Sequence, residues 1–335
     1  MNPAPATTSG VAGATPRIEY LQLSPGQASP TDTLFAVGFG AGSAPAPFGI
    51  RVPLEPLSGQ DLVEIWRATG EIHRGESDGI RFSNDDHFLA GVLEVAESEH
   101  RDLAEATAFA YRAIAGFQAA SAFPHVLRTW NYFDAINLGA GEDERYRGFC
   151  SGRVAGLERL RQAQHPAATV IGRRDGHRVL QVYWLAGRLP GVALENPRQV
   201  SAYLYPRQYG ETSPTFSRAM LVAQRLLMVS GTASIVGHTS RHRDDTRAQV
   251  REIIANLDAL LARAHAQAPA LPAQLGRHTL IKAYLKNRGD LALVEELLRE
   301  RLPAESPLLV LQGDVCRAEL LVEFDCIQGP AEPGS

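Results

Sequence analysis

Carboxylates and thiols are concentrated in the C-terminal stretch "GDVCRAELLVEFDCIQG", residues 313–329. Glu323 lies there between Val322 and Phe324, in the most hydrophobic strand that the sequence predicts. An apolar environment disfavours the charged form of a carboxyl group, raises its pKa and so suits it to donate a proton near neutral pH. The alternative role for Glu323 is a structural ion pair with an arginine.

Asp325 shares the face of Glu323, because side chains alternate along a strand. Its like charge could tune the acid, but we favour a structural role in which the backbone or an arginine satisfies it. Cys316 lies upstream of Glu323, and Cys326 follows Asp325 directly. Lone cysteines are most often buried packing residues, and this is our interpretation of Cys326 and Cys150.

The helices that must position these groups are predicted from apolar spacing and capping. Asp102 is a good N-cap, and the third helix carries an apolar stripe along one face. That stripe comprises Val250, Ile253, Ile254, Leu257, Leu260 and Leu261. The predicted helices cover 102–120, 141–162, a segment starting near Asp244 or Asp245, and 291–302.

Strands fill the intervening segments, and the two halves of the chain repeat one order of elements. The predicted fold class is therefore α+β, with two tandem β-β-α-β-α-β modules whose mixed sheets pack on helices. We expect a disordered tail at 1–16, an N-terminal module at 17–194 and a C-terminal module at 195–335. The strands are predicted at 17–23, 33–40, 48–54, 125–133, twice within 168–187, at 225–238, at 278–286 and twice around Gly313.

Composition narrows the class of protein. The 335 residues are 44% hydrophobic and 21% charged, with a net charge of −4, so no basic excess favours nucleic acid or an acidic membrane. Three cysteines without a C-x-x-C pair are typical of reduced thiols. The N-terminus lacks signal-peptide features, and the most apolar window, "AMLVAQRLLMV", is too short to span a bilayer. We expect a cytoplasmic protein.

Several longer stretches of the sequence resemble known protein families. Residues 220–328, and more faintly 100–187, resemble the YjgF-type reactive-intermediate deaminase fold. The chain as a whole is more similar to the chorismatases, in "LRTWNYFDAIN", "ERYRGFCSGR", "NPRQVSAYLYPRQYGETSPTFSRA", "SGTASIVGHTSRH" and "CRAELLVEFDCIQG". The resemblance implies cofactor-free conversion of chorismate to 3-hydroxybenzoate and pyruvate, with 4-hydroxybenzoate from some members. It also implies that Glu323 protonates the enolpyruvyl ether, at a site in or beside the C-terminal module.

Chorismate carries two carboxylates, and these favour arginine as the binding residue. Arg218, in the apolar "SPTFSRA", is the best candidate, since an unpaired buried guanidinium would be costly. Arg153 of "CSGRVAG" could reach the crevice between the modules, or could face solvent. Tyr205 and Tyr209 could donate hydrogen bonds to the substrate, or could pack in the core.

The product is predicted from two marks that the resemblance supplies. A cysteine seven residues before the catalytic glutamate marks the aromatic-product type, and Cys316 has this position. The second mark is a small residue in "SGTAS", which could be Gly231 or Ala233. Gly231 would agree with 3-hydroxybenzoate, whereas Ala233 would favour hydrolysis to a dihydroxycyclohexadiene carboxylate. Cys316 is accordingly predicted to steer a reactive intermediate.

Other motifs and functions carry less weight. His238 and His242 lie in a loop without an evident third ligand, so we predict no metal site. The glycine-rich segment 38–49 runs into proline instead of a helix N-terminus, which argues against phosphate binding. Rival functions are imine or enamine deamination and a non-catalytic sensor of aromatic acids. The sequence leaves a monomer and a homo-oligomer both open.

Overall fold

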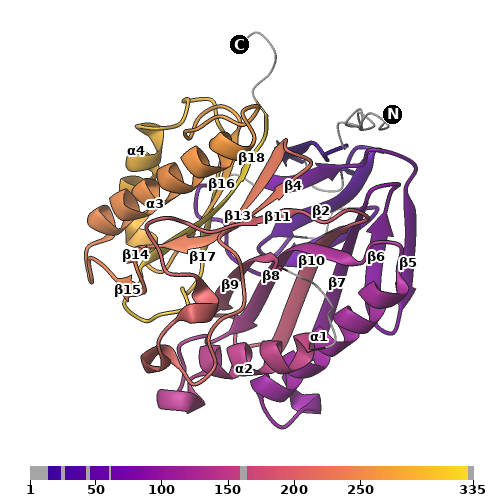
Figure 1. The fold of residues 1–335 in the computed structure, drawn as a ribbon, viewed down its shortest axis with the longest axis horizontal. Helices are drawn as coiled ribbons and strands as arrows, with labels where there is room; N and C mark the ends of the chain where they lie inside the picture. Colours follow the sequence, from indigo (N-terminus) through magenta and orange to yellow (C-terminus); the bar gives the residue numbers. More distant parts are fainter. Residues whose placement is uncertain (1–13, 24–26, 43–45, 60–61, 159–163, 331–335) are drawn as a thin grey trace, which may run out of the picture.

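The computed structural model describes residues 14–23, 27–42, 46–59, 62–158 and 164–330. Most of the tail predicted at 1–16, and the end of the helix predicted at 141–162, lie outside these residues. The described strands form one four-stranded sheet, two six-stranded sheets and a short two-stranded ribbon. Helices pack on the two larger sheets, which confirms the α+β class (Figure 1).

The first sheet precedes both large sheets in the chain and has the strand order β1-β4-β2-β3. Its β2 and β3 are parallel, whereas β4 is antiparallel to β1 and β2. The strands are β1 (Ile18–Gln22), β2 (Thr33–Phe39), β3 (Gly49–Val52) and β4 (Leu62–Arg67).

The middle sheet has the order β5-β6-β7-β10-β8-β9 and packs on α1 and α2. Its strands are β5 (His73–Ser77), β6 (Ile80–Asn84), β7 (Phe88–Ala96), β8 (His125–Asp134), β9 (Ala167–Arg173) and β10 (Val179–Gly187). The helices are α1 (Leu103–Ala120) and α2 (Arg145–Leu157), with 3₁₀ turns η1 (Glu97–Glu99) and η2 (Gly141–Asp143).

The C-terminal sheet has the order β11-β12-β13-β18-β16-β17 and packs on α3 and α4. Its strands are β11 (Val192–Leu194), β12 (Ala219–Val222), β13 (Leu226–Ala233), β16 (Thr279–Leu285), β17 (Leu308–Gln312) and β18 (Val322–Gln328). The remaining elements are α3 (Thr246–Gln267), α4 (Leu291–Arg299), the ribbon β14 (Ile235–Val236) with β15 (Thr239–Ser240), and the 3₁₀ turns η3 (Ala202–Leu204), η4 (Arg207–Tyr209) and η5 (Arg288–Asp290).

The two six-stranded sheets match strand for strand, because each has three strands, a helix, a strand, a helix and two strands in chain order. The predicted β-β-α-β-α-β pattern has two leading strands and one closing strand per copy, whereas each sheet has three and two. Both closing strands of each sheet were among the strands predicted from the sequence, but none of the three leading strands of the middle sheet was. The structure adds a simpler sheet, whose order β1-β4-β2-β3 and parallel pair repeat β13-β18-β16-β17. Between β1 and β2, and between β2 and β3, the described residues form no α-helix, whereas the other two sheets have helices at these places.

Local signals explain why two of the helices begin where they were predicted. The side chain of Asp102 accepts a hydrogen bond from the Glu105 amide at 2.8 Å, and Asp245 accepts one from Ala248 at 2.9 Å. Each aspartate thereby satisfies an amide that has no partner within the helix. The predicted apolar stripe of α3 is buried against the C-terminal sheet.

A core between the three sheets holds the molecule together and fixes how the sheets face one another. It contains Trp66 of the first sheet, Trp130 of the middle sheet and Tyr284 of the C-terminal sheet. Trp66 contacts Trp130 edge to face, with ring centroids 5.9 Å apart. A buried ion pair between Lys282 and Glu64 at 2.6 Å joins the first sheet to the last.

Candidate active site

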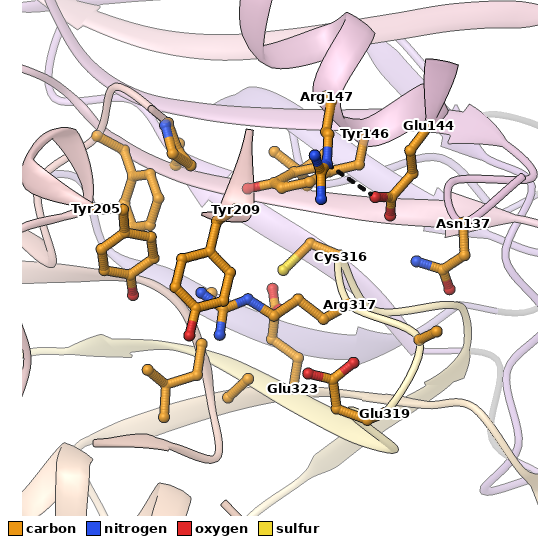
Figure 2. Close-up of a pocket in the computed structure, with 18 of the residues that line it drawn as sticks. Asn137, Glu144, Tyr146, Arg147, Tyr205, Tyr209, Cys316, Arg317, Glu319 and Glu323 are labelled. Atoms are coloured by element: carbon orange, nitrogen blue, oxygen red, sulfur yellow. Dashed lines mark ion pairs between the residues drawn. The ribbon is translucent and has the colours of Figure 1, made fainter. Parts of the chain in front are cut away.

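One pocket lies where the middle and C-terminal sheets meet, and it has a volume of about 380 Å³ (Figure 2). Hydrogen bonds hold its two sides together: the Ala168 amide donates to Ser230 Oγ at 2.8 Å, and Gly172 and Asp314 pair through their backbones. The lining residues are Asn137, Gly139, Glu144, Tyr146, Arg147, Ala168, Val170, Tyr205, Tyr209, Pro214, Phe216, Arg218, Gly231, Ala233, Ile235, Cys316, Arg317, Ala318, Glu319 and Glu323.

Glu323 points into this pocket from β18 and is 5% exposed. Burial, followed by the like charge of Asp325, raises the pKa of Glu323 to about 8, against the smaller opposing effect of Arg128 and Arg218. An acid with this pKa keeps its proton at neutral pH and can donate it to a substrate. The apolar neighbours of Glu323 in the sequence were the signal for this environment.

A bulge in β13 makes room for the Glu323 carboxyl group. The register between β13 and β18 shifts between Val229 and Thr232, opposite Asp325. At Gly231, inside this bulge, a Cβ atom would lie only 2.0 Å from Glu323 Oε1. Glycine is therefore required wherever the carboxyl group keeps this position. Gly231 and Ala233 both line the pocket, and Gly231 is the residue that the carboxyl group touches.

Asp325 is bound within the core. Its Oδ2 atom accepts hydrogen bonds from Tyr284 at 3.0 Å and Thr169 at 3.1 Å, and lies 3.4 Å from Arg128 Nη2. The buried carboxylates of Asp325 and Glu64 are thus matched by the buried cations Arg128 and Lys282. Among the described residues, no cation forms an ion pair with Glu323, which is consistent with a protonated carboxyl group.

Arg218 lies just before β12 and is 4% exposed. Its Nη2 atom donates to the Val200 carbonyl at 2.9 Å and to the Tyr205 hydroxyl at 2.8 Å. Its Nε atom is buried without a hydrogen-bond partner among the described residues. A guanidinium with an unused donor in a pocket is suited to bind a carboxylate.

Arg317 adds a second cation to the pocket, and it was not among the residues predicted from the sequence. Its guanidinium stacks on the Tyr209 ring at 3.9 Å and donates to the His238 carbonyl and Ser240 Oγ at 3.0 Å. Tyr209 in turn bonds to Nδ1 of His238 at 3.2 Å. The one sequence feature that could have selected Arg317 is its position directly after Cys316.

Cys316 lies in the segment that leads into β18 and shares the pocket with Glu323. Burial, then the neighbouring Glu323 carboxylate, raises the pKa of the Cys316 thiol to about 12. Cys316 is therefore a neutral thiol at physiological pH, not a thiolate nucleophile. Cys150 and Cys326 are buried in the core clusters, in agreement with a packing role.

Arg153 does not line the pocket. It is 2% exposed on α2, with its guanidinium over the Tyr111 ring at 5.1 Å and Nη2 at 3.4 Å from Thr129 Oγ1. The helix therefore directs this side chain inward between α1 and β8, instead of toward the crevice. The position of Arg153 in a predicted helix did not show whether its side chain faces the crevice, because that direction depends on how α2 packs.

The N-terminal end of α2 supplies further pocket residues that sequence reasoning missed. Tyr146 and Arg147 both line the cavity, and Arg147 is paired with Glu142 at 2.8 Å and Glu144 at 3.3 Å. These charges lie in a predicted helix, where solvent exposure is the usual expectation. These side chains face one cavity because α2 lies beside the C-terminal part of the chain.

Neither a metal-binding cluster nor a membrane-spanning helix is found among the described residues. Among the described residues, no three His, Cys, Asp or Glu side chains form a group that could hold a metal ion. His242, one of the two histidines singled out in the sequence, bonds to Glu252 at 3.1 Å. No helix in the described part of the chain is long and apolar enough to cross a membrane.

Comparisons with known proteins relate this chain to one family. Residues 64–186 match the N-terminal domain of FkbO/Hyg5-like chorismatases. A 3-hydroxybenzoate synthase of Streptomyces hygroscopicus is 35% identical over 289 residues, which cover 82% of this chain and 84% of that protein. A chorismatase of Streptomyces rapamycinicus is 33% identical over 286 residues, covering 79% and 82%. A chorismatase crystal structure superposes with a TM-score of 0.82 at 28% identity, covering 93% of this chain and 98% of that one. These relationships confirm the resemblance seen in the sequence: the chain belongs to the chorismatase family.

Proposed function

We propose that this protein converts chorismate to 3-hydroxybenzoate and pyruvate. The observation that carries the proposal is the Glu323 carboxyl group, buried with a pKa of about 8 in a pocket that also contains Cys316 and Arg218. The relatives named above, a 3-hydroxybenzoate synthase among them, support the same reaction.

The reaction begins with proton transfer from Glu323 to the methylene carbon of the enolpyruvyl ether. The methylene becomes a methyl group and the ether carbon becomes an oxocarbenium ion. The neighbouring ring hydroxyl then attacks the ring carbon that carries the ether: its oxygen bonds to that carbon and gives an arene oxide, and the bond from the same carbon to the ether oxygen breaks, so that this oxygen leaves as the keto oxygen of pyruvate. The arene oxide opens at its other carbon, which leaves the oxygen on the carbon that carried the ether. The ring then loses a proton as it becomes aromatic, and Glu323 is the base available to recover it. Substrate and products balance without water, so a pocket that limits water favours this outcome over hydrolysis.

Three arginines line the pocket, and two of them, Arg218 and Arg317, are assigned to the two carboxylates of chorismate because Arg147 is already paired with Glu142 and Glu144. Arg218 lines the pocket from beside β12, and Arg317 offers a guanidinium held against Tyr209. The fixed fork of arginine suits a planar carboxylate better than lysine does. Tyr205 holds Arg218, and Tyr209 holds Arg317, so both tyrosines take part through the arginines.

Hydrolysis to a dihydroxycyclohexadiene carboxylate is a second candidate, because Ala233 also lines the pocket and is paired with Glu323 across the strands. That reaction consumes one water, whereas the first consumes none. Purified protein incubated with chorismate should release pyruvate together with 3-hydroxybenzoate, both followed by chromatography. Pyruvate with the diol alone would favour the second candidate, and 4-hydroxybenzoate would appear in the same trace. The absence of pyruvate would contradict both.

A further inference from the structure

Tyr146 lines the pocket but has no role in the proposed mechanism. Tyr146 and Cys150 are one turn apart on α2 and therefore lie on the same side of the helix. Tyr146 lines the pocket, whereas Cys150 is buried behind it. Tyr146 and Cys316 are both partly buried and pack on the core cluster that contains Cys150.

Tyr146 lies close enough to Cys150 and Cys316 for these groups to affect one another's pKa. Figure 2 shows the tyrosine ring and the Cys316 sulfur on the same side of the cavity. Burial raises the pKa of each of these three groups, so all of them keep their protons at neutral pH. Three neutral groups in a row can each donate one hydrogen and accept another.

The other tyrosines of the pocket are engaged elsewhere. The Tyr205 hydroxyl accepts from Arg218 at 2.8 Å, and the Tyr209 hydroxyl bonds to His238 at 3.2 Å. Tyr146 is therefore the tyrosine whose hydroxyl is placed to act on Cys316.

We propose that Tyr146 is a positioning residue that orients the Cys316 thiol and thereby sets the product ratio; this rests on the proposed function. In this arrangement Cys150 S–H donates to Tyr146 Oη, and Tyr146 O–H donates to Cys316 Sγ. The S–H bond of Cys316 is then directed at the substrate instead of rotating among its staggered positions. Cys316 remains a thiol throughout, and no bond to sulfur forms. A directed S–H donor can hold an oxygen of the ring intermediate, favouring aromatisation over the addition of water.

The test measures pyruvate, 3-hydroxybenzoate and the dihydrodiol from chorismate with wild-type protein and Tyr146→Phe. Phenylalanine keeps the ring and removes the hydroxyl. We expect the ratio of diol to 3-hydroxybenzoate to rise about fivefold, the effect of one neutral hydrogen bond, while pyruvate release falls less than the 3-hydroxybenzoate yield. Tyr209→Phe is the matched control, because it also removes one pocket hydroxyl and should lower turnover without changing the ratio.

A double variant decides whether Tyr146 acts through the thiol. Tyr146→Phe combined with Cys316→Ala should give the same ratio as Cys316→Ala alone, because the two residues act as one unit. Additive effects, or an unchanged ratio in Tyr146→Phe, would overturn the inference and leave the proposed function standing. Absence of pyruvate from the wild-type protein would instead overturn the proposed function. If Tyr146→Phe fails to fold, Cys150→Ala tests the far end of the same row and should shift the ratio in the same direction.

Discussion

Replacing Glu323 by glutamine should remove activity and, at neutral pH, increase stability. The ordinary pKa of this carboxyl group is 4.5, and its pKa in the folded protein is about 8. Between these values the folded protein keeps a proton that the unfolded chain releases. The free energy of unfolding contributed by Glu323 therefore decreases as pH rises, by about 1.4 kcal/mol per pH unit.

The size of the effect on stability follows from the pH range between the two pKa values. Relative to a neutral glutamine, Glu323 should cost little below pH 4.5, roughly 3 kcal/mol at pH 7 and roughly 5 kcal/mol above pH 8. Urea unfolding of wild-type and Glu323→Gln protein at these pH values would measure the difference, with the buried tryptophans as a fluorescence probe. In the same samples Glu323→Gln should release no pyruvate but still bind chorismate, because the arginines remain.

Glu319 provides a control of opposite sign in the same pocket. Burial alone would raise its pKa, but hydrogen bonds from its own backbone and Ser240, together with Arg243 and Arg317, lower it overall. Glu319→Gln should therefore destabilise the protein at neutral pH and lose that effect in acid. If Glu323→Gln were less stable than wild type at every pH, or still released pyruvate, Glu323 would not be a buried neutral acid.

Further outcomes follow from the same geometry. For wild-type protein, kcat/KM should fall as pH rises through about 8, because the donor loses its proton, and a pH series would show it. Gly231→Ala should displace the Glu323 carboxyl group and reduce pyruvate release, since its Cβ would lie 2.0 Å from Oε1; full activity would contradict this contact. Arg218→Lys should raise KM for chorismate by about tenfold or more because lysine lacks the planar fork, which steady-state kinetics would measure. Cys316→Ala should change the product ratio more than the rate of ether cleavage, and an unaltered product trace would return this cysteine to a packing role. Asp325→Asn should move the alkaline limb of activity to lower pH, because the like charge that raises the pKa of Glu323 is lost; a limb that stays in place would leave burial as the whole cause.

Much of the fold could be predicted because its signals are local. Asp102 and Asp245 cap helices through amides three residues away, and the α3 stripe follows the helical period. None of the strands β4 to β7 was predicted. For β5 the reason is local, because His73–Ser77 is mostly exposed and carries no run of apolar residues. The sheet of β1 to β4 was assigned to the N-terminal module, since nothing local indicates that its strands pair separately.

The candidate site divides in the same way. Glu323 could be selected from the sequence, because its apolar neighbours along β18 indicate burial and a raised pKa, and the resemblance to the chorismatases favours a proton donor over a structural ion pair. The sequence could not show which of Arg153, Tyr146 and Arg317 line the pocket. The directions of these side chains depend on how α2 and the segment before β18 pack across two sheets. Burial along one strand is a short-range property, whereas a pocket depends on residues far apart in the chain. The sequence by itself therefore determined the chemistry of the acid, and the tertiary structure alone decided which side chains surround it.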